Sequence, residues 1–549
     1  MHRRLSVALP LLLLLAGCSP VNVPVDGAAA AADPARIEAH VEFLADDLLE
    51  GREAGTRGFD LAARYVASQF AQLGLEPGGD DGSWLQAVPL LRGERLQEGS
   101  AFVVERDDAT IEFEFEQQFL PGIGFDAEQW VVRAPMVFVG QAVVAPEFGH
   151  DDLAGVDLRG KIAVMLAGAP ERFGNDPRAL YASSREKLRL LAARGAVGVI
   201  GIGDPVREDK SPWARGARNW RRPAMRLRDA DGRPVDSFPE LRGSARLSVA
   251  AARRLFEGAP QSADEVYQRL ADGRLQAFDL PGVARISGRS RLSRLDSANV
   301  VGRLAGSHAE LSAEHIVHTA HLDHVGIGAE VDGDAIYNGA VDNALGVAVM
   351  LEAARLAAAA PRTARSQVFV ALTAEEKGLL GAYHFAAHPG IDGELVANIN
   401  MDMPVLLGPR SDVIPIGIEH SSLQGVVESA AAELRLTLTP DPFPEEVVFI
   451  RSDQFPFVQR GVPAVYLDGG IHSELPGVDG RAELDGFLRR HYHQPSDQTD
   501  LGIHYPSAAR LATLNHRIGR RVGDDPQRPR WNTGDFFGDR FAGEAATAP

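Results

Sequence analysis

The chain has 549 residues, of which 45% are hydrophobic and 24% are charged. This length predicts two to four domains, and the composition excludes a largely disordered, fibrous or multi-spanning membrane protein. The net charge of −19 argues against a nucleic-acid partner, because an acidic surface repels phosphates. The single Cys excludes an intrachain disulfide and metal sites built from several thiolates.

The N-terminal segment has the features of a secretory signal. Basic residues precede an apolar run over residues 5–16, which is shorter than the roughly 20 residues of a membrane span. The run ends in Leu-Ala-Gly-Cys18, which resembles the lipobox of bacterial lipoproteins. The resemblance implies a signal peptide over residues 1–18, a tether over residues 19–34, and lipid attachment at Cys18. It also implies a place in the bacterial cell envelope, at the periplasmic face of the outer membrane.

Two amphipathic helices are predicted next. The first begins at Asp33 and Pro34, because Asp is a favoured N-cap and Pro fits the first helical position, and its apolar spacing continues to Leu48. The second covers residues 59–73 and ends at Gly74, a typical C-cap. We interpret both helices as scaffold.

Between residues 130 and 290 the hydrophobic pattern differs from that of the preceding helices. Short apolar runs predict strands, with one helix before the last of them: strands 136–139, 162–166 and 196–202, helix 184–194. The run Gly160–Val164, with Lys187 and the run Gly195–Ile200, resembles the protease-associated domain, a β-rich insert of secreted peptidases. The resemblance implies such an insert over residues 130–290, to which we assign no chemistry. Residues 207–236 are predicted to form a long loop.

After residue 299 strands alternate with helices, which predicts an α/β sheet covered by helices on both faces. The predicted elements are strands 316–320, 367–373, 396–401 and 464–467, and a helix over residues 345–359. Titratable side chains lie at the strand ends, at the start of the helix and in one later segment: His321, Asp323, Asp342, Glu375, Glu376, Asp402 and His493. Because ligands of such sheets bind beyond the carboxyl ends of the strands, we expect these groups to converge.

Two histidines and several carboxylates, without a thiolate, suit zinc. A pair of ions with one bridging carboxylate needs five ligands, and His321, Asp342, Glu376, Asp402 and His493 supply five. The remaining Glu375 is then placed to move a proton. Taken singly, such residues also have structural interpretations, such as a helix N-cap or a turn residue.

Five strings strengthen this interpretation and stand at residues 321–326, 338–346, 373–381, 400–403 and 492–497. Together they resemble the zinc peptidase family of aminopeptidase Y and glutamate carboxypeptidase II, from about residue 36 to about residue 520. The resemblance implies a mixed sheet flanked by helices, the zinc exopeptidase fold. It implies a discontinuous catalytic domain over residues 35–129 and 291–525, interrupted by the insert. A C-terminal tail then covers residues 526–549.

The resemblance also implies a role for each residue of the set. His321 and Asp402 bind one Zn²⁺, Glu376 and His493 bind a second, and Asp342 bridges the two. Glu375 is the general base, and Asp323 accepts the other ring N–H of His321. Tyr492 precedes the last ligand and helps to hold the oxyanion.

These roles imply a dizinc exopeptidase that acts on peptides. An aminopeptidase is favoured, because an ammonium group suits a site crowded with carboxylates. A carboxypeptidase of the same family is an alternative, and so are a glutaminyl cyclase-like transferase with one zinc and a receptor-like binding protein without activity. The complete ligand set argues against the last two. The sequence indicates neither an oligomeric state nor the residue preference at the cleaved bond.

Overall fold

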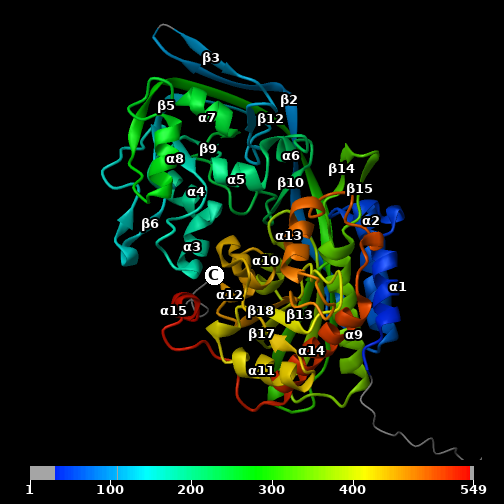
Figure 1. Ribbon diagram of the computed structural model, residues 1–549. Helices are drawn as coiled ribbons and strands as arrows, with labels where there is room; N and C mark the ends of the chain where they lie inside the picture. The colour runs from blue at the N-terminus through cyan, green and yellow to red at the C-terminus, as the bar shows by residue number, and fades with distance from the viewer. Residues whose placement is uncertain (1–30, 108, 544–549) are drawn as a thin grey trace, which may run out of the picture.

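The structure is a computed structural model and describes residues 31–107 and 109–543. Figure 1 shows two lobes joined by the long strands β2 (Leu85–Glu105) and β12 (Phe278–Leu304). Sixteen strands form one hydrogen-bonded sheet that runs through both lobes. The predicted signal peptide, Cys18 and most of the tether lie outside the described residues.

The lower lobe in Figure 1 contains a mixed sheet. Its strands follow one another in the order β19 (Thr437–Leu438), β18 (Asp412–Ile416), β20 (Ala464–Gly469), β17 (Glu394–Asn400), β13 (Glu314–His321), β16 (Ser366–Leu372) and β12. Strand β13 lies between β16 and β17 and runs parallel to both. Strand β12 pairs antiparallel with β16, and β18 pairs antiparallel with β20. The predicted mixed sheet is confirmed.

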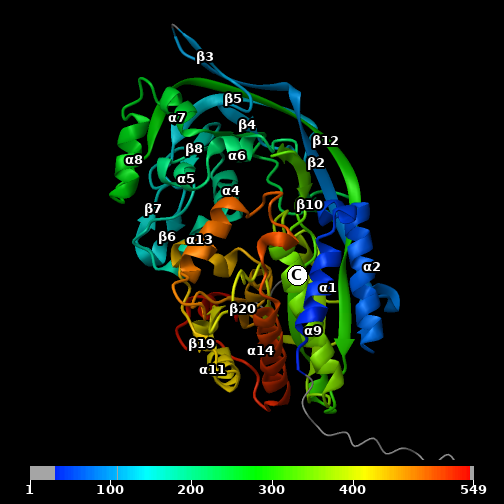
Figure 2. The same cartoon turned by 45° about the vertical axis from the view of Figure 1, so that its right-hand side comes forward.

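Helices cover both faces of this sheet, as the alternation of strands and helices predicts. One face carries α1 (Pro34–Leu44), α2 (Arg57–Gln72), α9 (Gly346–Ala359), α11 (Leu423–Glu433) and α14 (Tyr505–Asp524). The other carries α10 (Leu380–Ala387), α12 (Gln454–Val458) and α15 (Phe536–Phe541). Within β13, Ile316 packs in the first apolar cluster and Val317 in the second, because successive side chains of a strand point to opposite faces. Helices α1, α9 and α14 lie side by side (Figure 2).

Most predicted elements of the lower lobe coincide with observed ones to within two residues. Helix α1 begins as expected, since the side chain of Asp33 accepts a hydrogen bond from the Ala35 N–H at 3.0 Å. The helix ends at Leu44, however, and does not continue to Leu48. Asp46 starts a separate 3-10 turn by accepting from the Leu48 N–H at 2.8 Å, which leaves the Leu48 side chain exposed.

The upper lobe is built on strands β5 (Gln129–Phe138), β8 (Ile162–Leu166), β9 (Gly198–Ile202), β11 (Ser244–Leu247) and β4 (Phe119–Pro121), which are adjacent in this order. Its apolar core includes Trp130 and Ile200, and also Phe102 and Phe119 from earlier in the chain. The packing therefore groups the segment that contains Phe102 and Phe119 with the upper lobe, whereas Val88 and Leu90, earlier in β2, pack with Leu380 of the lower lobe. The domain limits at residues 130 and 290 remain a prediction.

The predicted loop over residues 207–236 contains regular structure, so that prediction is wrong in part. Helix α6 (Trp213–Ala217) and strand β10 (Ala224–Leu227) lie within it, and α5 (Pro205–Lys210) overlaps its start. Strand β10 pairs antiparallel with β2. Elements this short depend on such tertiary contacts, and the apolar pattern of their own sequence does not reveal them.

The segment after α14 packs against the lower lobe up to residue 543, the last that the structure describes. Trp531 and Phe537 join the apolar cluster of α10 and α12. The Nδ1 atom of His420 lies 2.7 Å from Oδ2 of Asp535, just before α15. Within the described ranges, no helix has both the length and the apolar character needed to cross a lipid bilayer.

Candidate metal centre

The predicted site residues converge at one edge of the lower sheet. His321 ends β13, Glu375 and Glu376 follow β16, and Asp402 follows β17, and these three strands are parallel. Asp342 lies in the turn before α9, and His493 lies in the loop after α13 (Gly480–Arg490). The parallel strands present their carboxyl ends at the same edge, which is why residues distant in the sequence meet there.

One group of potential metal ligands consists of His321, Asp342 and Asp402. The Nε2 atom of His321 lies 2.9 Å from Oδ1 of Asp402 and 3.3 Å from Oδ1 of Asp342. All three residues are buried. An imidazole and two carboxylates that converge in this way form a donor set suited to zinc.

A second group consists of His324, Asp342, Glu376 and His493. The Nε2 atom of His493 lies 3.0 Å from Oε2 of Glu376 and 3.2 Å from Oδ2 of Asp342. The ligand atoms of the group all lie within 4.8 Å of one another. The five residues predicted as ligands are thus brought together, and His324 joins them.

Asp342 belongs to both groups. Its Oδ1 faces His321, whereas its Oδ2 faces His493. Within the described part of the chain, Oδ2 of Asp342 and Oε1 of Glu376 are buried without a hydrogen-bond partner. Buried charges that lack a partner are costly unless they coordinate a metal ion. The donor set and these two oxygen atoms therefore fit a pair of divalent cations.

The charges within the centre also fit bound cations. Burial acts to lower the pKa of His493, but the carboxylates of Glu376 and Asp342 outweigh it and raise that pKa to about 10. Burial raises the pKa of the Glu375 carboxyl well above its usual range. Both shifts arise from an excess of carboxylates in a buried place, which bound cations would offset.

Asp323 has a different contact from the one that the family resemblance implies. The Nδ1 atom of His321 lies 3.0 Å from the main-chain carbonyl oxygen of Asp323, not from its carboxylate. The carboxylate instead accepts from the Glu375 N–H at 3.0 Å and from the Glu376 N–H at 3.4 Å. The carbonyl still sets the tautomer of His321, while the carboxylate holds the turn that carries both glutamates.

Two further buried residues hold the loops of the centre and were not predicted. Arg52 donates to the carbonyl oxygens of Leu322 and Gly339, at 2.9 and 3.1 Å, and so joins the segment after β13 to the turn before Asp342. Asp497 accepts from the main-chain N–H of Asp342 at 3.0 Å. Burial raises the pKa of Asp497 to about 7. These contacts position Asp342 from outside the ligand set.

Asp402 is held by a third set of residues that sequence analysis missed. The Ser452 hydroxyl donates to Oδ2 of Asp402 at 2.6 Å, and the Tyr466 hydroxyl donates to its main-chain carbonyl at 2.7 Å. The neighbouring Asp453 is fully buried, and burial raises its pKa well above the usual range. These residues precede or lie in β20, so only the folded sheet brings them to the site.

Tyr492 lies beside the second group of ligands. Its ring stacks on the ring of His493, with the centroids 3.9 Å apart. Its main-chain carbonyl accepts from the Arg215 guanidinium of the upper lobe. The role of the Tyr492 hydroxyl as an oxyanion donor remains a prediction.

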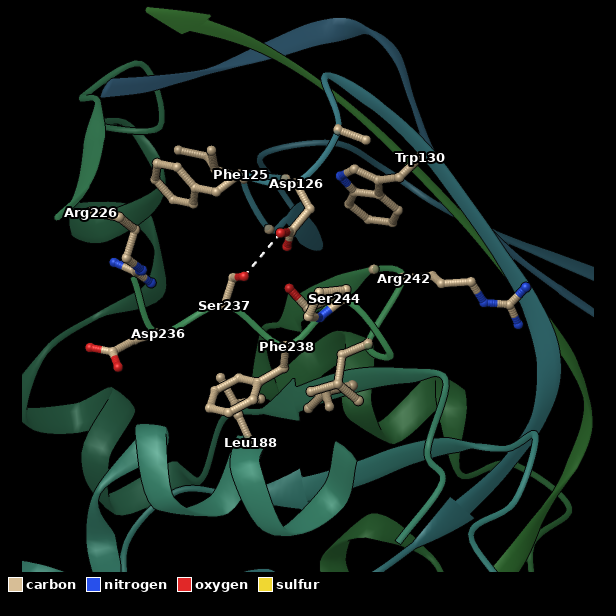
Figure 3. Close-up of a pocket in the computed structure, with 18 of the residues that line it drawn as sticks. Phe125, Asp126, Trp130, Leu188, Arg226, Asp236, Ser237, Phe238, Arg242 and Ser244 are labelled. Carbon is tan, nitrogen blue, oxygen red and sulfur yellow. Dashed lines mark hydrogen bonds between the residues drawn. The ribbon is translucent and has the colours of Figure 1, made fainter. Parts of the chain in front are cut away.

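The upper lobe contains a pocket of about 380 Å³, and none of the predicted site residues lines it (Figure 3). Two of its polar groups are engaged with neighbours: Asp126 accepts from the Ser237 hydroxyl at 2.9 Å, and the Arg226 guanidinium stacks on the Phe125 ring at 5.0 Å. The potential metal ligands converge in the lower lobe, away from this pocket, and so form the candidate site.

Comparison with known proteins supports this assignment. Residues 299–518 match peptidase family M28, and this segment includes every residue of both ligand groups. The chain therefore carries a peptidase family M28 domain. The match confirms the family resemblance that the five strings indicate. No curated protein matches the sequence of the chain.

Solved structures with a similar fold include three bacterial proteins. An aminopeptidase from Aneurinibacillus sp. strain AM-1 is 20% identical, with a TM-score of 0.53 over 91% of this chain and 95% of that chain. BSAP, a zinc aminopeptidase from Bacillus subtilis, is 18% identical, with a TM-score of 0.45 over 90% of this chain and 97% of that chain. A peptidase M28 precursor from Shewanella amazonensis is 17% identical, with a TM-score of 0.44 over 91% of this chain and 99% of that chain. The first of these shows that the fold extends over nearly the whole chain.

Proposed function

We propose that the protein is a dizinc aminopeptidase, which removes N-terminal residues from peptides. The observation that carries the proposal is the position of Asp342, whose two oxygen atoms face two different groups of histidine and carboxylate ligands. A carboxylate placed in this way can bridge two ions, which lie about 3.5–4 Å apart in two-metal hydrolases. The M28 domain supports peptide hydrolysis, and the aminopeptidase from Aneurinibacillus shares the fold.

The surrounding residues have separate tasks in this proposal. Bound zinc ions would polarise the peptide carbonyl and bring the pKa of a water molecule close to 7. Glu375 takes the proton from the attacking water and passes it to the amine that leaves. Asp323 keeps Glu375 in place through the main-chain N–H of that residue. The Tyr492 hydroxyl donates to the oxygen that becomes negative on the carbonyl.

The charge of the site favours a free N-terminus as the recognised end of the substrate. Four carboxylates, those of Asp342, Glu375, Glu376 and Asp402, lie within the centre. A substrate ammonium group would be attracted to this negative charge, whereas a terminal carboxylate would be repelled unless a cation received it.

One residue favours a second candidate, a carboxypeptidase. The guanidinium of Arg222, from the upper lobe, stacks on the ring of Tyr337 at 4.1 Å. Two of its nitrogen atoms, Nε and Nη2, are buried and have no hydrogen-bond partner in the described part of the chain. Burial lowers the pKa of Arg222, and nearby Tyr337, Glu376 and Glu53 oppose this effect. A cation near Glu376 is the kind of group that binds a substrate carboxylate.

Blocked peptides and metal analysis test both candidates. We expect close to two zinc ions per chain, cleavage that N-acetylation abolishes, and little effect of C-terminal amidation. The opposite peptide result, together with loss of cleavage in Arg222→Met, would establish the carboxypeptidase. Content of about one ion would contradict the dizinc centre, and cleavage inside a long peptide blocked at both ends would contradict any exopeptidase.

A further inference from the structure

His324 lies within the candidate metal centre, although the five predicted ligands already suffice for two ions. It follows β13 by three residues, and its side chain is fully buried. Its Nδ1 atom lies 2.8 Å from Oε1 of Glu376 and 3.8 Å from Oδ2 of Asp342. Nδ1 of His324 and Nε2 of His493 thus both lie beside Glu376 and face Oδ2 of Asp342, whereas His321 faces Oδ1.

The contact between His324 and Glu376 does not have the angle of a hydrogen bond. Across the described ranges, neither ring nitrogen of His324 has a hydrogen-bond partner, nor do Oε1 of Glu376 and Oδ2 of Asp342. A neutral imidazole buried with both nitrogens unpaired costs free energy, and so does each unpaired carboxylate oxygen. Four buried atoms therefore lack a partner among the described residues: two nitrogens of His324 and one oxygen each of Glu376 and Asp342. A single cation bound to Nδ1 and to the two oxygen atoms would give three of them a partner.

The packing around His324 fixes its ring in this place. Gly339 has a φ of +63°, and a Cβ atom there would lie 2.6 Å from Cγ of His324. The main-chain N–H of His324 lies 3.3 Å from the carbonyl oxygen of Arg52. The ring is thus wedged against the turn that leads to Asp342, and a glycine at position 339 leaves the room for it.

We propose that His324 is a sixth protein ligand of the metal pair, bound through Nδ1 to the same ion as Glu376 and His493. This inference rests on the proposed two-metal centre. Four protein side chains then hold that ion: His324, Asp342, Glu376 and His493. The other ion has only His321, Asp342 and Asp402.

The two ions would differ in their chemistry. Four protein ligands fill a tetrahedral zinc site, as in structural zinc sites, whereas three leave one position open, as in catalytic sites. Water and the substrate carbonyl would then have access chiefly at the His321 side. The four-ligand ion would also be the tighter one, so a chelator should remove the two ions in separate stages.

Two substitutions separate metal binding by His324 from a merely structural role. His324→Asn retains a donor near the position of Nδ1 but supplies a poor zinc ligand, whereas His324→Cys supplies a thiolate. His384→Asn, on α10 and outside both ligand groups, is the matched control. The readouts are zinc content by elemental analysis, zinc affinity by chelator competition, and the absorption spectrum of the cobalt-substituted proteins.

We expect the wild type to hold two zinc ions that are lost in two stages, and His384→Asn to behave in the same way. His324→Asn should weaken the tighter ion by more than the roughly 10–100-fold that loss of a hydrogen-bonding partner to a ligand causes. His324→Cys should regain affinity and show a sulfur-to-cobalt charge-transfer band. That band also keeps the test decisive if His324→Asn does not fold.

Two outcomes would overturn the inference while leaving the proposed function intact. These are unchanged affinity of both ions in His324→Asn, and a folded His324→Cys protein that binds two cobalt ions without the charge-transfer band. A wild type that binds a single ion would instead overturn the two-metal function. The assignment of His324 as a ligand would then be supported if His324→Asn weakens that ion, and overturned if it does not.

Discussion

Asp342 serves two groups of side chains because its two oxygen atoms point in different directions, toward His321 and toward His493. Its main-chain N–H donates to Asp497, so a contact outside both groups fixes its position. Loss of the Asp342 side chain should therefore disturb both groups, whereas loss of either histidine should disturb one. The same distinction between holding a metal and acting beside it applies to the adjacent glutamates.

Glu375 and Glu376 should respond differently to replacement by Gln. Glu375→Gln should keep its metal but lose about 10²–10⁴-fold in turnover, the usual contribution of a general base. Glu376→Gln should lower zinc content, because its carboxylate lies 3.0 Å from Nε2 of His493. Elemental analysis and peptide hydrolysis on both variants test this. Metal loss in Glu375→Gln, with full metal in Glu376→Gln, would show that the roles are reversed.

Most site residues could be predicted because they directly follow strands that are marked by apolar runs. His324 also lies just after a strand, but five residues already reach the expected number of ligands, so nothing in the sequence points to a sixth. The contact of the Asp323 carboxylate was wrongly predicted, because it depends on the path of the turn after β16. Arg52 and Asp453 could not be predicted, since tertiary packing alone brings them to the site.

At the scale of elements, the lower lobe was well predicted because each strand is apolar throughout and each long helix is amphipathic or fully buried. Strands β2 and β12 were not predicted. Strand β12 has 27 residues, many of them charged, and its register with β2 shifts between Ser287 and Arg289. A strand that belongs to two lobes and faces solvent along part of its length does not alternate regularly between buried and exposed residues. Its sequence therefore lacks the pattern from which a strand is predicted.

Helix α4 (Ser184–Ala193) carries a buried lysine whose charge should make stability depend on pH. The Lys187 ammonium donates to the carbonyl oxygen of Gly168, and burial lowers the pKa of Lys187 to about 7. Between pH 7 and about 10.4, the unfolded chain binds a proton that the folded chain lacks. The free energy of unfolding should therefore rise with pH in this range, by at most about 1.4 kcal/mol per pH unit.

Urea unfolding at pH 7 and pH 9 measures this effect. Lys187→Met should be more stable than the wild type at pH 7, and the difference should shrink at pH 9. Lys210→Met, which removes a half-exposed lysine, is the control and should keep the wild-type dependence on pH. An equal rise with pH in Lys187→Met and the wild type would contradict the prediction.

At the scale of the whole molecule, the upper lobe contacts the loop that carries His493. Arg215 donates to the carbonyl oxygen of Arg489 at 3.0 Å and to that of Tyr492. Arg218 donates to Oε1 of Gln494 at 2.9 Å. The segment over residues 207–236, for which the sequence predicts only a long loop, thus contacts the loop that carries His493, and only the folded arrangement reveals this contact.

Arg215→Ala should loosen this loop. Hydrogen bonds from a charged donor contribute about 1.5–3 kcal/mol each, so local opening of residues 489–494 should become at least roughly tenfold more frequent. Hydrogen exchange of this segment measures the change. Arg221→Ala is the control, because the Arg221 guanidinium stacks on the ring of its neighbour Trp220, at 4.2 Å. Equal exchange in both variants would show that Arg215 does not restrain the loop.

We also propose that the protein is anchored in the cell envelope through a lipid on Cys18. Cys18→Ser should abolish this attachment, so the variant should stay uncleaved or appear in the soluble fraction. Membrane fractionation and the mass of the mature protein test the proposal. Retention in the membrane with an unchanged mature mass would exclude lipid attachment at Cys18.

The shared strand β12 has a consequence for how the molecule melts. One end of β12 pairs with β5 in the upper lobe and the other with β16 in the lower lobe, while β2 runs beside it between them. The ladder between β2 and β12 runs from one lobe into the other, so unfolding of either lobe should loosen strands that the other lobe uses and leave bare strand edges. Calorimetry should therefore record a single endotherm whose van't Hoff and calorimetric enthalpies agree, despite the two separate apolar cores.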